Sequence, residues 1–225
     1  MSYLTWDEKT ITDFSEKNIN TQYDSGFLFT REDKGKMYQT RSLRIDLSQF
    51  ELSSENRRIL RKTEDISLTA VPLPHTNYHW KIGKMAKDFY QEKFGDGTFS
   101  ANKIKELMTD ANKGNFNKIF VYGGTHLEKY QVDHKEFQLG YCIALENTEL
   151  IHYCYPFYDM DCSPKNMGMG MMTGAVIYAK EKGKKYIYLG SLRRPTDTYK
   201  LQFTGSEWFD GKKWTQDKER LSFAS

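Results

Sequence analysis

The amino-acid sequence predicts an α/β fold. Three observations carry this prediction: two helical stretches near the middle of the chain, three strand-like runs after them, and a glycine-rich stretch that leads into a further helix and strand. Helices and strands in this order pack as layers around one core. The chain has 225 residues, of which 28% are charged and 15% aromatic, which is typical of a globular protein with a sizeable core.

The first third of the chain combines short helices with strand-like alternation. Hydrophobic period, capping residues and turn residues decide each assignment. The expected elements are, in order, a short helix over residues 5–20 capped by Thr5, strands over 26–29 and 42–47 with a turn at 33–36 between them, a basic helix after Ser53 that contains Arg57 and Arg58, and a proline-containing connector over 66–78.

The remainder has longer and more regular patterns. Apolar residues recur at helical spacing in two stretches, and apolar runs bounded by turn residues indicate strands. The expected elements are helices over 79–94 and 100–110, strands over 118–122, 137–145 and 150–157, a loop over 159–164, a helix over 170–181 and a strand over 185–189.

Composition sets limits on partners and compartment. The net charge is +3, but residues 31–62 hold nine Lys and Arg against five acids, and 180–200 form a second basic cluster. Such clusters attract phosphates or are solvated surface.

The N-terminus lacks a signal-peptide pattern and no apolar run reaches the length of a membrane span, so we expect a cytoplasmic protein without a membrane partner. Cys142, Cys154 and Cys162 lack zinc spacing and are expected to be free thiols.

The glycine-rich stretch PKNMGMGMM, residues 164–172, lies between a predicted strand and a predicted helix. Glycines at such a junction let backbone N–H groups approach an anion. The spacing Lys165-x-x-Gly168-x-Gly170 is similar to the R/Q-x-x-G-x-G/A pyrophosphate loop of GNAT acyltransferases, with Lys at the first position. A tight strand-to-helix turn is the alternative.

Longer segments narrow the resemblance. YPFYDMD (155–161), residues 166–191 with the strand end YLGS, YKLQF (199–203) and residues 25–62 resemble, in this order, the arginyl- and leucyl-tRNA–protein transferases. That family has FYD-x-D, a glycine loop, a YLGY-like strand end and a YK-x-Q/R-F/Y element. Two departures stand out: residues 37–42 lack the family's cysteines, so no metal, haem or cluster is implied there, and Ser191 changes the strand end, which leaves the aminoacyl specificity undetermined.

The resemblance implies a GNAT-like acyltransferase fold, with a mixed, mainly antiparallel sheet flanked by helices. It implies a smaller N-terminal lobe over residues 1–75 and a catalytic domain over 76–225. The implied activity moves an amino acid from charged tRNA to the N-terminal amine of a protein or peptide, as in protein arginylation and the N-degron pathway. The implied partners are charged tRNA and such an N-terminus, and no cofactor is expected.

Four residues near the C-terminal strand end are the candidate catalytic groups. An aminoacyl ester is already activated, so transfer needs mainly positioning and a modest base for an amine whose reference pKa is about 8. We expect Asp197 to orient the amine, Gln202 to hold the ester and Lys200 to supply positive charge, with Tyr199 and Lys200 opposite one another along a strand-like run. A turn residue after Pro195 is the alternative for Asp197.

The candidate binding residues are polar, basic or glycine. Asp159 and Asp161 suit the cationic amino group of the donor, or cap the next helix. The basic residues suit a tRNA or an acidic peptide, or form a solvated helix face. The full predicted set is Arg57, Arg58, Tyr158, Asp159, Asp161, Lys165, Asn166, Gly168, Gly170, Ser191, Arg193 and Arg194. The five histidines lack ligand spacing, so no metal site is expected.

Two other functions fit the same residues. A GNAT enzyme would use the glycine stretch for the pyrophosphate of an acyl-CoA and acylate an amine. A non-catalytic relative would only bind RNA or protein N-termini. Calorimetric binding of an acyl-CoA favours the first alternative, whereas binding of charged tRNA favours transfer from tRNA.

Overall fold

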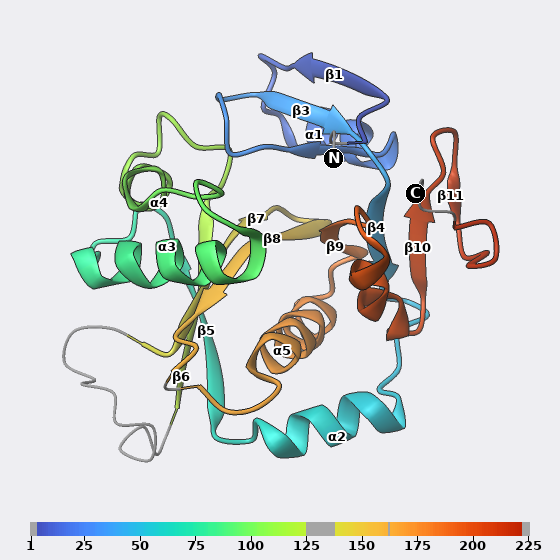
Figure 1. Ribbon diagram of the computed structural model, residues 1–225. Helices are drawn as coiled ribbons and strands as arrows, with labels where there is room; N and C mark the ends of the chain where they lie inside the picture. Colours follow the sequence, from blue (N-terminus) through green and yellow to red (C-terminus); the bar gives the residue numbers. More distant parts are fainter. Residues whose placement is uncertain (1–3, 125–137, 162, 222–225) are drawn as a thin grey trace. The chain divides into compact units, whose positions relative to one another are not determined.

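The computed structural model describes residues 4–124, 138–161 and 163–221 (Figure 1). Its contacts divide the chain into two compact units. The first comprises Met1–Ser53, Asn147–His152 and Ala179–Ser225, and the second comprises Ser54–Glu146 and Tyr153–Tyr178. Each unit is therefore assembled from separate parts of the sequence. The division into domains at residue 75 stays a prediction.

The first unit contains two groups of strands. Strands β1, β3 and β2 form a three-stranded antiparallel sheet in that order. Strands β11, β10, β4, β9 and the start of β8 follow one another in a second sheet. The pairs β11–β10, β10–β4 and β4–β9 are antiparallel, and β9–β8 is parallel. The elements are β1 (Asp7–Thr10), α1 (Glu16–Asp24), β2 (Phe27–Phe29), β3 (Lys36–Gln39), β4 (Ser42–Asp46), β9 (Tyr186–Ser191), the 3₁₀ helix η2 (Pro195–Gln202), β10 (Ser206–Phe209) and β11 (Trp214–Thr215).

The second unit pairs strands with helices. Its strands follow the order β8, β7, β6, β5, and β6 is antiparallel to both β5 and β7. Helices α3 and α4 pack against each other (Figure 1). The elements are α2 (Ser54–Lys62), β5 (Ile66–Pro72), α3 (Trp80–Phe94), α4 (Ala101–Thr109), β6 (Lys118–Gly124), β7 (Gly140–Glu146), β8 (Leu150–Tyr158) and α5 (Met167–Glu181). Strand β8 and helix α5 each contribute residues to both units.

Each unit has its own buried apolar core. Burying one such side chain contributes about 1.5–3 kcal/mol. Fully buried side chains in the first unit include Tyr23, Met37, Leu43, Ile45 and Ile187, and those in the second include Ile82, Phe120, Ile143, Phe157 and Met171. These residues come from the strands and from the apolar faces of the helices, as the sequence periodicity predicts.

The predicted fold class is confirmed: a mixed, mainly antiparallel arrangement of strands flanked by helices, with a helix between the parallel strands β8 and β9. The longer helices are confirmed near their predicted bounds because capping residues mark their starts. The side chains of His79 and Ser100 accept backbone N–H groups at the starts of α3 and α4. None of the described helices is both long and apolar enough to cross a membrane.

The prediction of one helix over residues 5–20 is wrong. That segment forms β1 and then the start of α1. The helix cap is Ser15, whose Oγ accepts the backbone N–H of Asn18 at 3.3 Å, and not Thr5. Residues 7–10 pair with β3 instead, and this pairing with a later segment overrides the local helical pattern.

The predicted connector over 66–78 is partly wrong. Its first residues, Ile66–Pro72, form strand β5, which pairs with β6 through seven residue pairs. Pro72 stands at the end of the strand, a place where a missing N–H is tolerated. Pro72 and Pro74 therefore mark where the strand ends, and they do not exclude a strand before them.

Candidate functional site

Strand β9 and the turn after it position the first group of candidate residues. Ile187, Tyr188 and Leu189 are buried, which fixes the strand in the sheet. Gly190 follows with φ +78°, a conformation that glycine adopts without strain. Leu192 is fully buried and donates its backbone N–H to the Arg41 carbonyl at 2.8 Å. The chain is thus held on both sides of Ser191.

Helix η2 begins with a capping arrangement centred on Asp197. Its Oδ2 accepts the backbone N–H groups of Arg193 at 2.9 Å and Arg194 at 2.8 Å. Pro195 occupies the first turn, where its missing N–H costs nothing. The predicted strand-like run over 199–203 is therefore wrong, because residues 195–202 form a 3₁₀ helix.

The helix brings Lys200 back to the end of β9. Its Nζ donates to the Ser191 carbonyl at 3.1 Å, and a Cβ on Gly190 would lie 4.0 Å from the same nitrogen. Gln202 donates through Nε2 to the Tyr199 carbonyl at 2.8 Å, and the Tyr199 side chain is 46% exposed. A carbonyl oxygen fixes an ammonium group without neutralising it, so this strand end carries a positioned positive charge.

A buried histidine, which the sequence analysis did not select, lies in the same unit. His152 on β8 pairs in register with Tyr188 on β9 and is 1% exposed. Its Nδ1 is 2.9 Å from the hydroxyl of Tyr23. Burial, with a smaller contribution from the Lys200 charge, lowers the pKa of His152 to about 3, so the ring is neutral at physiological pH. The one signal for it in the sequence is a polar residue within an apolar strand.

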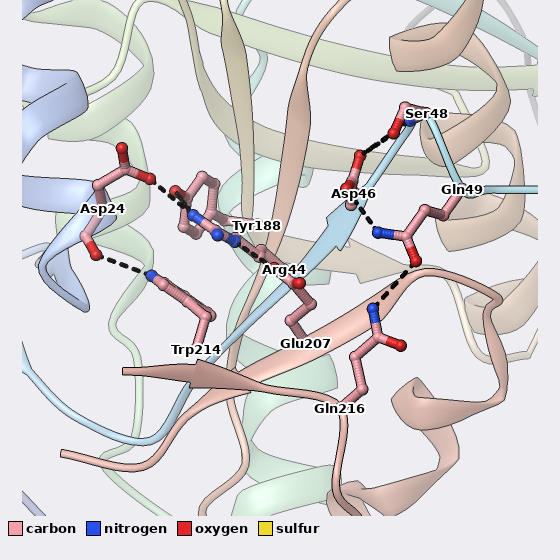
Figure 2. A network of polar contacts seen from close by, with 9 residues as sticks. All are labelled: Asp24, Arg44, Asp46, Ser48, Gln49, Tyr188, Glu207, Trp214 and Gln216. Atoms are coloured by element: carbon pink, nitrogen blue, oxygen red, sulfur yellow. Dashed lines mark hydrogen bonds and ion pairs between the residues drawn. The ribbon is translucent and has the colours of Figure 1, made fainter. Parts of the chain in front are cut away.

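Arg44 on β4, whose side chain is 8% exposed, forms an ion-pair network that the sequence pattern did not reveal (Figure 2). Its Nε donates to Glu207 at 2.9 Å and its Nη1 to Asp24 at 2.7 Å. The guanidinium carbon lies 3.8 Å from the Tyr186 ring centroid and 4.1 Å from that of Trp214. This network connects α1, β9, β10 and β11 to β4. It thereby stabilises β9, the strand that precedes the candidate residues 191–202.

The second unit holds the glycine stretch. The sequence predicted a loop that continues to residue 170. Helix α5 begins at Met167 instead, so Gly168 and Gly170 lie in its first turn. Asn166, with φ +72°, precedes the helix, and its carbonyl accepts the N–H of Gly170 at 2.9 Å.

Packing explains Gly170 but not Gly168. A Cβ on Gly170 would lie 2.6 Å from Thr63 Oγ1, and one on Gly168 would lie 3.4 Å from the Tyr158 ring. Gly170 therefore allows the helix to approach Thr63 closely, whereas a Cβ at position 168 would make an ordinary contact with Tyr158. This role requires no ligand.

The carboxylates before α5 lie near a lysine. The Asp159 N–H donates to the Leu139 carbonyl, and its Oδ1 accepts the N–H of Asp161 at 3.0 Å. The pKa of Lys84 is raised, first by its ion pair with Asp88 and also by the charges of Asp159 and Asp161. These two carboxylates thus belong to a mixed-charge cluster that already contains one ammonium group.

The basic helix α2 presents its two predicted residues differently. Arg58 donates to the Glu55 carboxylate through Nε at 2.6 Å, within one turn of the helix. Arg57 is exposed. The charge of Arg58 is therefore partly compensated, whereas Arg57 faces the solvent.

The predicted residues divide between the units. The first unit holds the group named here the strand-end site, which comprises Ser191, Arg193, Arg194, Asp197, Tyr199, Lys200 and Gln202. The second holds Arg57, Arg58, Tyr158, Asp159, Asp161, Lys165, Asn166, Gly168 and Gly170. Within the described ranges, no group of three or more His, Cys, Asp or Glu side chains is arranged to hold a metal ion. Cys142 and Cys154 are free thiols, and Cys162 lies outside the described residues.

Sequence comparison relates the chain to aminoacyl transferases, although no protein-family model matches it. Three curated relatives named aspartate/glutamate leucyltransferase are similar. The protein from Saccharophagus degradans is 21% identical over 76% of this chain and 69% of its own length. That from Acinetobacter baumannii (strain ATCC 17978) is 22% identical over 82% and 65%. That from Leptospira interrogans is 24% identical over 87% and 75%. The chain therefore spans 65–75% of the length of these relatives.

Solved structures with a related arrangement include L-PGS from Bacillus licheniformis, which is 13% identical with a TM-score of 0.47 and covers 78% of this chain and 52% of its own. FemX is 12% identical with a TM-score of 0.42 over 82% of this chain and 62% of its own.

Proposed function

We propose that this protein transfers an amino acid from charged tRNA to the N-terminal amine of a protein or peptide. The observation that carries the proposal is the strand-end site, where Asp197 and Lys200 are held in place by backbone contacts at the end of β9. The similarity to leucyltransferases over most of the chain supports the same activity. Because this reaction uses charged tRNA, we place the protein in the cytoplasm.

The reaction forms one bond and breaks another. The acceptor amine attacks the carbonyl carbon of the aminoacyl ester, an amide bond forms, and the bond from that carbon to the ribose oxygen breaks. The proton lost by the amine passes to the ribose oxygen. The ester is already activated, so orientation of the two groups supplies most of the acceleration.

The four candidate catalytic residues of the site each have a role in this scheme. Oδ2 of Asp197 is held by two backbone N–H groups, and we assign the acceptor amine to Oδ1. Lys200 stabilises the negative charge that develops on the ester oxygen. Gln202 orients the ester, while Tyr199, which is 46% exposed, contacts the incoming substrate. The neutral ring of His152 supports this arrangement from the core without adding a positive charge.

The donor and acceptor follow from the names of the relatives. We assign leucyl-tRNA as the donor and a peptide with an N-terminal Asp or Glu as the acceptor. An acidic first residue suits the basic side chains of Arg193 and Arg194. The product would carry a new N-terminal leucine, which connects the activity with the N-degron pathway. Transfer from arginyl-tRNA would instead make the reaction protein arginylation.

The test is a transfer assay with a panel of radiolabelled aminoacyl-tRNAs and peptides that differ only in their first residue. We expect label to pass from leucyl-tRNA to peptides that begin with Asp or Glu. The same peptides with acetylated N-termini are the matched control and should accept nothing. Binding of charged tRNA without transfer to any peptide would indicate a non-catalytic protein. Acylation from an acyl-CoA, without transfer from tRNA, would replace this proposal by the acyl-CoA alternative.

A further inference from the structure

We propose that a lysine-lined pocket in the first unit binds the phosphodiester backbone of tRNA. This inference rests on the proposed function, since it assigns a docking surface for the donor. The pocket, named here the lysine pocket, has a volume of about 420 Å³. Its lining residues are Asp46, Leu47, Ser48, Lys180, Gly183, Lys184, Lys185 and Tyr186, all of which belong to the first unit.

The local sequence explains why the lysines converge. Helix α5 ends at Glu181, Gly183 turns the chain with φ +66°, and β9 starts at Tyr186. Four of the six residues 180–185 are lysines, and three of them line the pocket. The opposite wall comes from the end of β4, where the Leu47 N–H donates to the Lys185 carbonyl at 3.0 Å. This backbone hydrogen bond and the pairing of Asp46 with Tyr186 in the β4–β9 ladder join both walls.

Two ammonium groups are fixed in position. Lys180 Nζ donates to the Phe50 carbonyl, and Lys184 Nζ donates to the Asn147 carbonyl at 2.5 Å. Carbonyl oxygens orient an ammonium group but leave its full positive charge, and each ammonium group has three N–H donors. Lys185 is exposed, with Nζ 5.1 Å from the Tyr186 ring centroid. The pocket therefore presents three cations, two of which are already ordered.

One carboxylate opposes this charge. Asp46 lines the pocket, but its oxygens accept hydrogen bonds from Ser48 and from Gln49 Nε2, so it is turned toward its own loop (Figure 2). Three lysines and one aspartate leave a net charge of +2. The end of α5 adds the equivalent of about half a negative charge. The balance remains positive, which favours a polyanion.

The form of the pocket favours backbone phosphate over a base. Lysines act as point charges with rotatable donors, whereas base recognition uses planar or bidentate groups in fixed geometry. Contacts of this kind fix the position of a nucleic acid without reading its sequence. We therefore expect the pocket to strengthen binding of any tRNA, charged or deacylated, and to leave selection of the amino acid to the strand-end site.

The test measures binding of deacylated tRNA by fluorescence anisotropy between 50 and 200 mM salt. The variant Lys180→Gln/Lys184→Gln/Lys185→Gln removes the pocket charges. We expect the slope of log affinity against log salt to fall by about 0.7–0.9 for each lost phosphate contact. The loss of affinity between the two salt concentrations then shrinks by about threefold per contact. With charged tRNA, KM should rise while kcat stays unchanged.

The matched control removes the same charge from exposed lysines elsewhere in this unit, as Lys34→Gln/Lys212→Gln/Lys213→Gln. It should keep the wild-type slope. If the control weakens binding as much as the pocket variant, or if the pocket variant keeps the wild-type slope, the pocket is not a docking surface.

Two further variants keep the test decisive. Lys185→Gln alone changes only an exposed side chain and should lower the slope by about one contact even if the triple variant fails to fold. Asp46→Asn removes the opposing charge and should tighten binding, and looser binding would contradict the proposal. A wild-type protein that binds no tRNA would overturn the proposed function as well. A wild-type protein that transfers amino acids while its pocket variant binds tRNA normally would overturn the pocket alone.

Discussion

Asp197 Oδ2 accepts the backbone N–H of Arg194 at 2.8 Å, and this contact caps helix η2. The side chain thus has a structural role, which the sequence offered as the alternative to catalysis. The two roles make different demands on the carboxylate: a cap needs an acceptor oxygen, whereas orienting a substrate amine also needs the negative charge. Amide and alkyl substitutions separate these demands.

We expect Asp197→Asn to lower the single-turnover rate of transfer by roughly 10²-fold or more, with little change in tRNA affinity. The reason is that Asn keeps an oxygen for the two N–H groups but loses the charge. Asp197→Ala should in addition lower the free energy of unfolding by about 0.5–2 kcal/mol, because the cap is lost. Rapid-quench transfer and urea unfolding measure the two effects.

The Asn variant decides the assignment. A folded Asp197→Asn protein that transfers at the wild-type rate would reduce Asp197 to a helix cap, and the strand-end site would then lose its principal catalytic candidate. A rate loss in the Ala variant alone would carry no such meaning, since displacement of η2 would also move Lys200.

Arg44 should be among the most sensitive positions for stability. Its side chain is only 8% exposed and pairs with Glu207, whose side chain is 17% exposed. Arg44→Met keeps much of the volume but leaves that carboxylate unpaired, so we expect a loss of about 3–5 kcal/mol in the free energy of unfolding. Urea denaturation monitored by circular dichroism measures this loss.

The matched control is Arg58→Met. Arg58 also pairs with a glutamate, but both side chains are more than 40% exposed. Exposed pairs contribute about 0–1 kcal/mol, so this variant should be nearly neutral. Equal losses of unfolding free energy in the two variants would show that burial does not increase the contribution of the Arg44 pair to stability.

The sequence predicted the longer elements well because their signals are local. Helix α4 has an amphipathic period and a serine cap, and both act within a few residues. The errors arose where distant partners decide. Residues 7–10 are a strand because they pair with β3, and no local pattern announces that partner.

The candidate site was predicted less well, for the same reason. Pro195 and Asp197 already form a helix-start signal, but the alternating pattern after them suggested a strand. The ion pair between Arg44 and Glu207 joins residues far apart in the sequence, so spacing alone cannot reveal it. For the glycine stretch the sequence left a pyrophosphate loop and a tight turn as alternatives, and the contact of Gly170 with Thr63 could not be predicted because Thr63 lies far away in the sequence.

Two of the glycines of α5, Gly170 and Gly174, allow this packing role to be tested. Ala normally stabilises a helix over Gly by about 0.5–1 kcal/mol. A Cβ at position 170 would lie 2.6–2.9 Å from three atoms of the Thr63 side chain, so we expect Gly170→Ala to destabilise by about 1–3 kcal/mol. Thermal unfolding of the variant and the wild type measures the sign.

Gly174→Ala is the control in the same helix. Its Cβ would meet only Leu68 Cδ1, at 3.9 Å, so the helix preference should dominate and the variant should be as stable as the wild type or more so. Thr63→Ala should recover part of the loss in the Gly170→Ala background. Stabilisation by Gly170→Ala would disprove the packing explanation.

His152 should make stability depend on pH under mildly acidic conditions. Burial, together with the Lys200 charge, lowers its pKa to about 3 in the folded protein, against about 6.5 in the unfolded chain. Between these values the unfolded state binds more protons. The contribution of neutral His152 is therefore present above pH 6.5 and is lost as the pH falls toward 3.

We expect His152→Gln to remove this dependence, because glutamine keeps a polar partner for the Tyr23 hydroxyl but does not titrate. From pH 7 to pH 5 the wild type should lose about 2 kcal/mol more of its unfolding free energy than the variant. Urea unfolding at both pH values measures each loss, and titrating groups common to both proteins cancel in the comparison. Equal losses would mean that His152 is protonated in the folded protein at pH 5, and its assignment as a neutral support of the strand-end site would then be wrong.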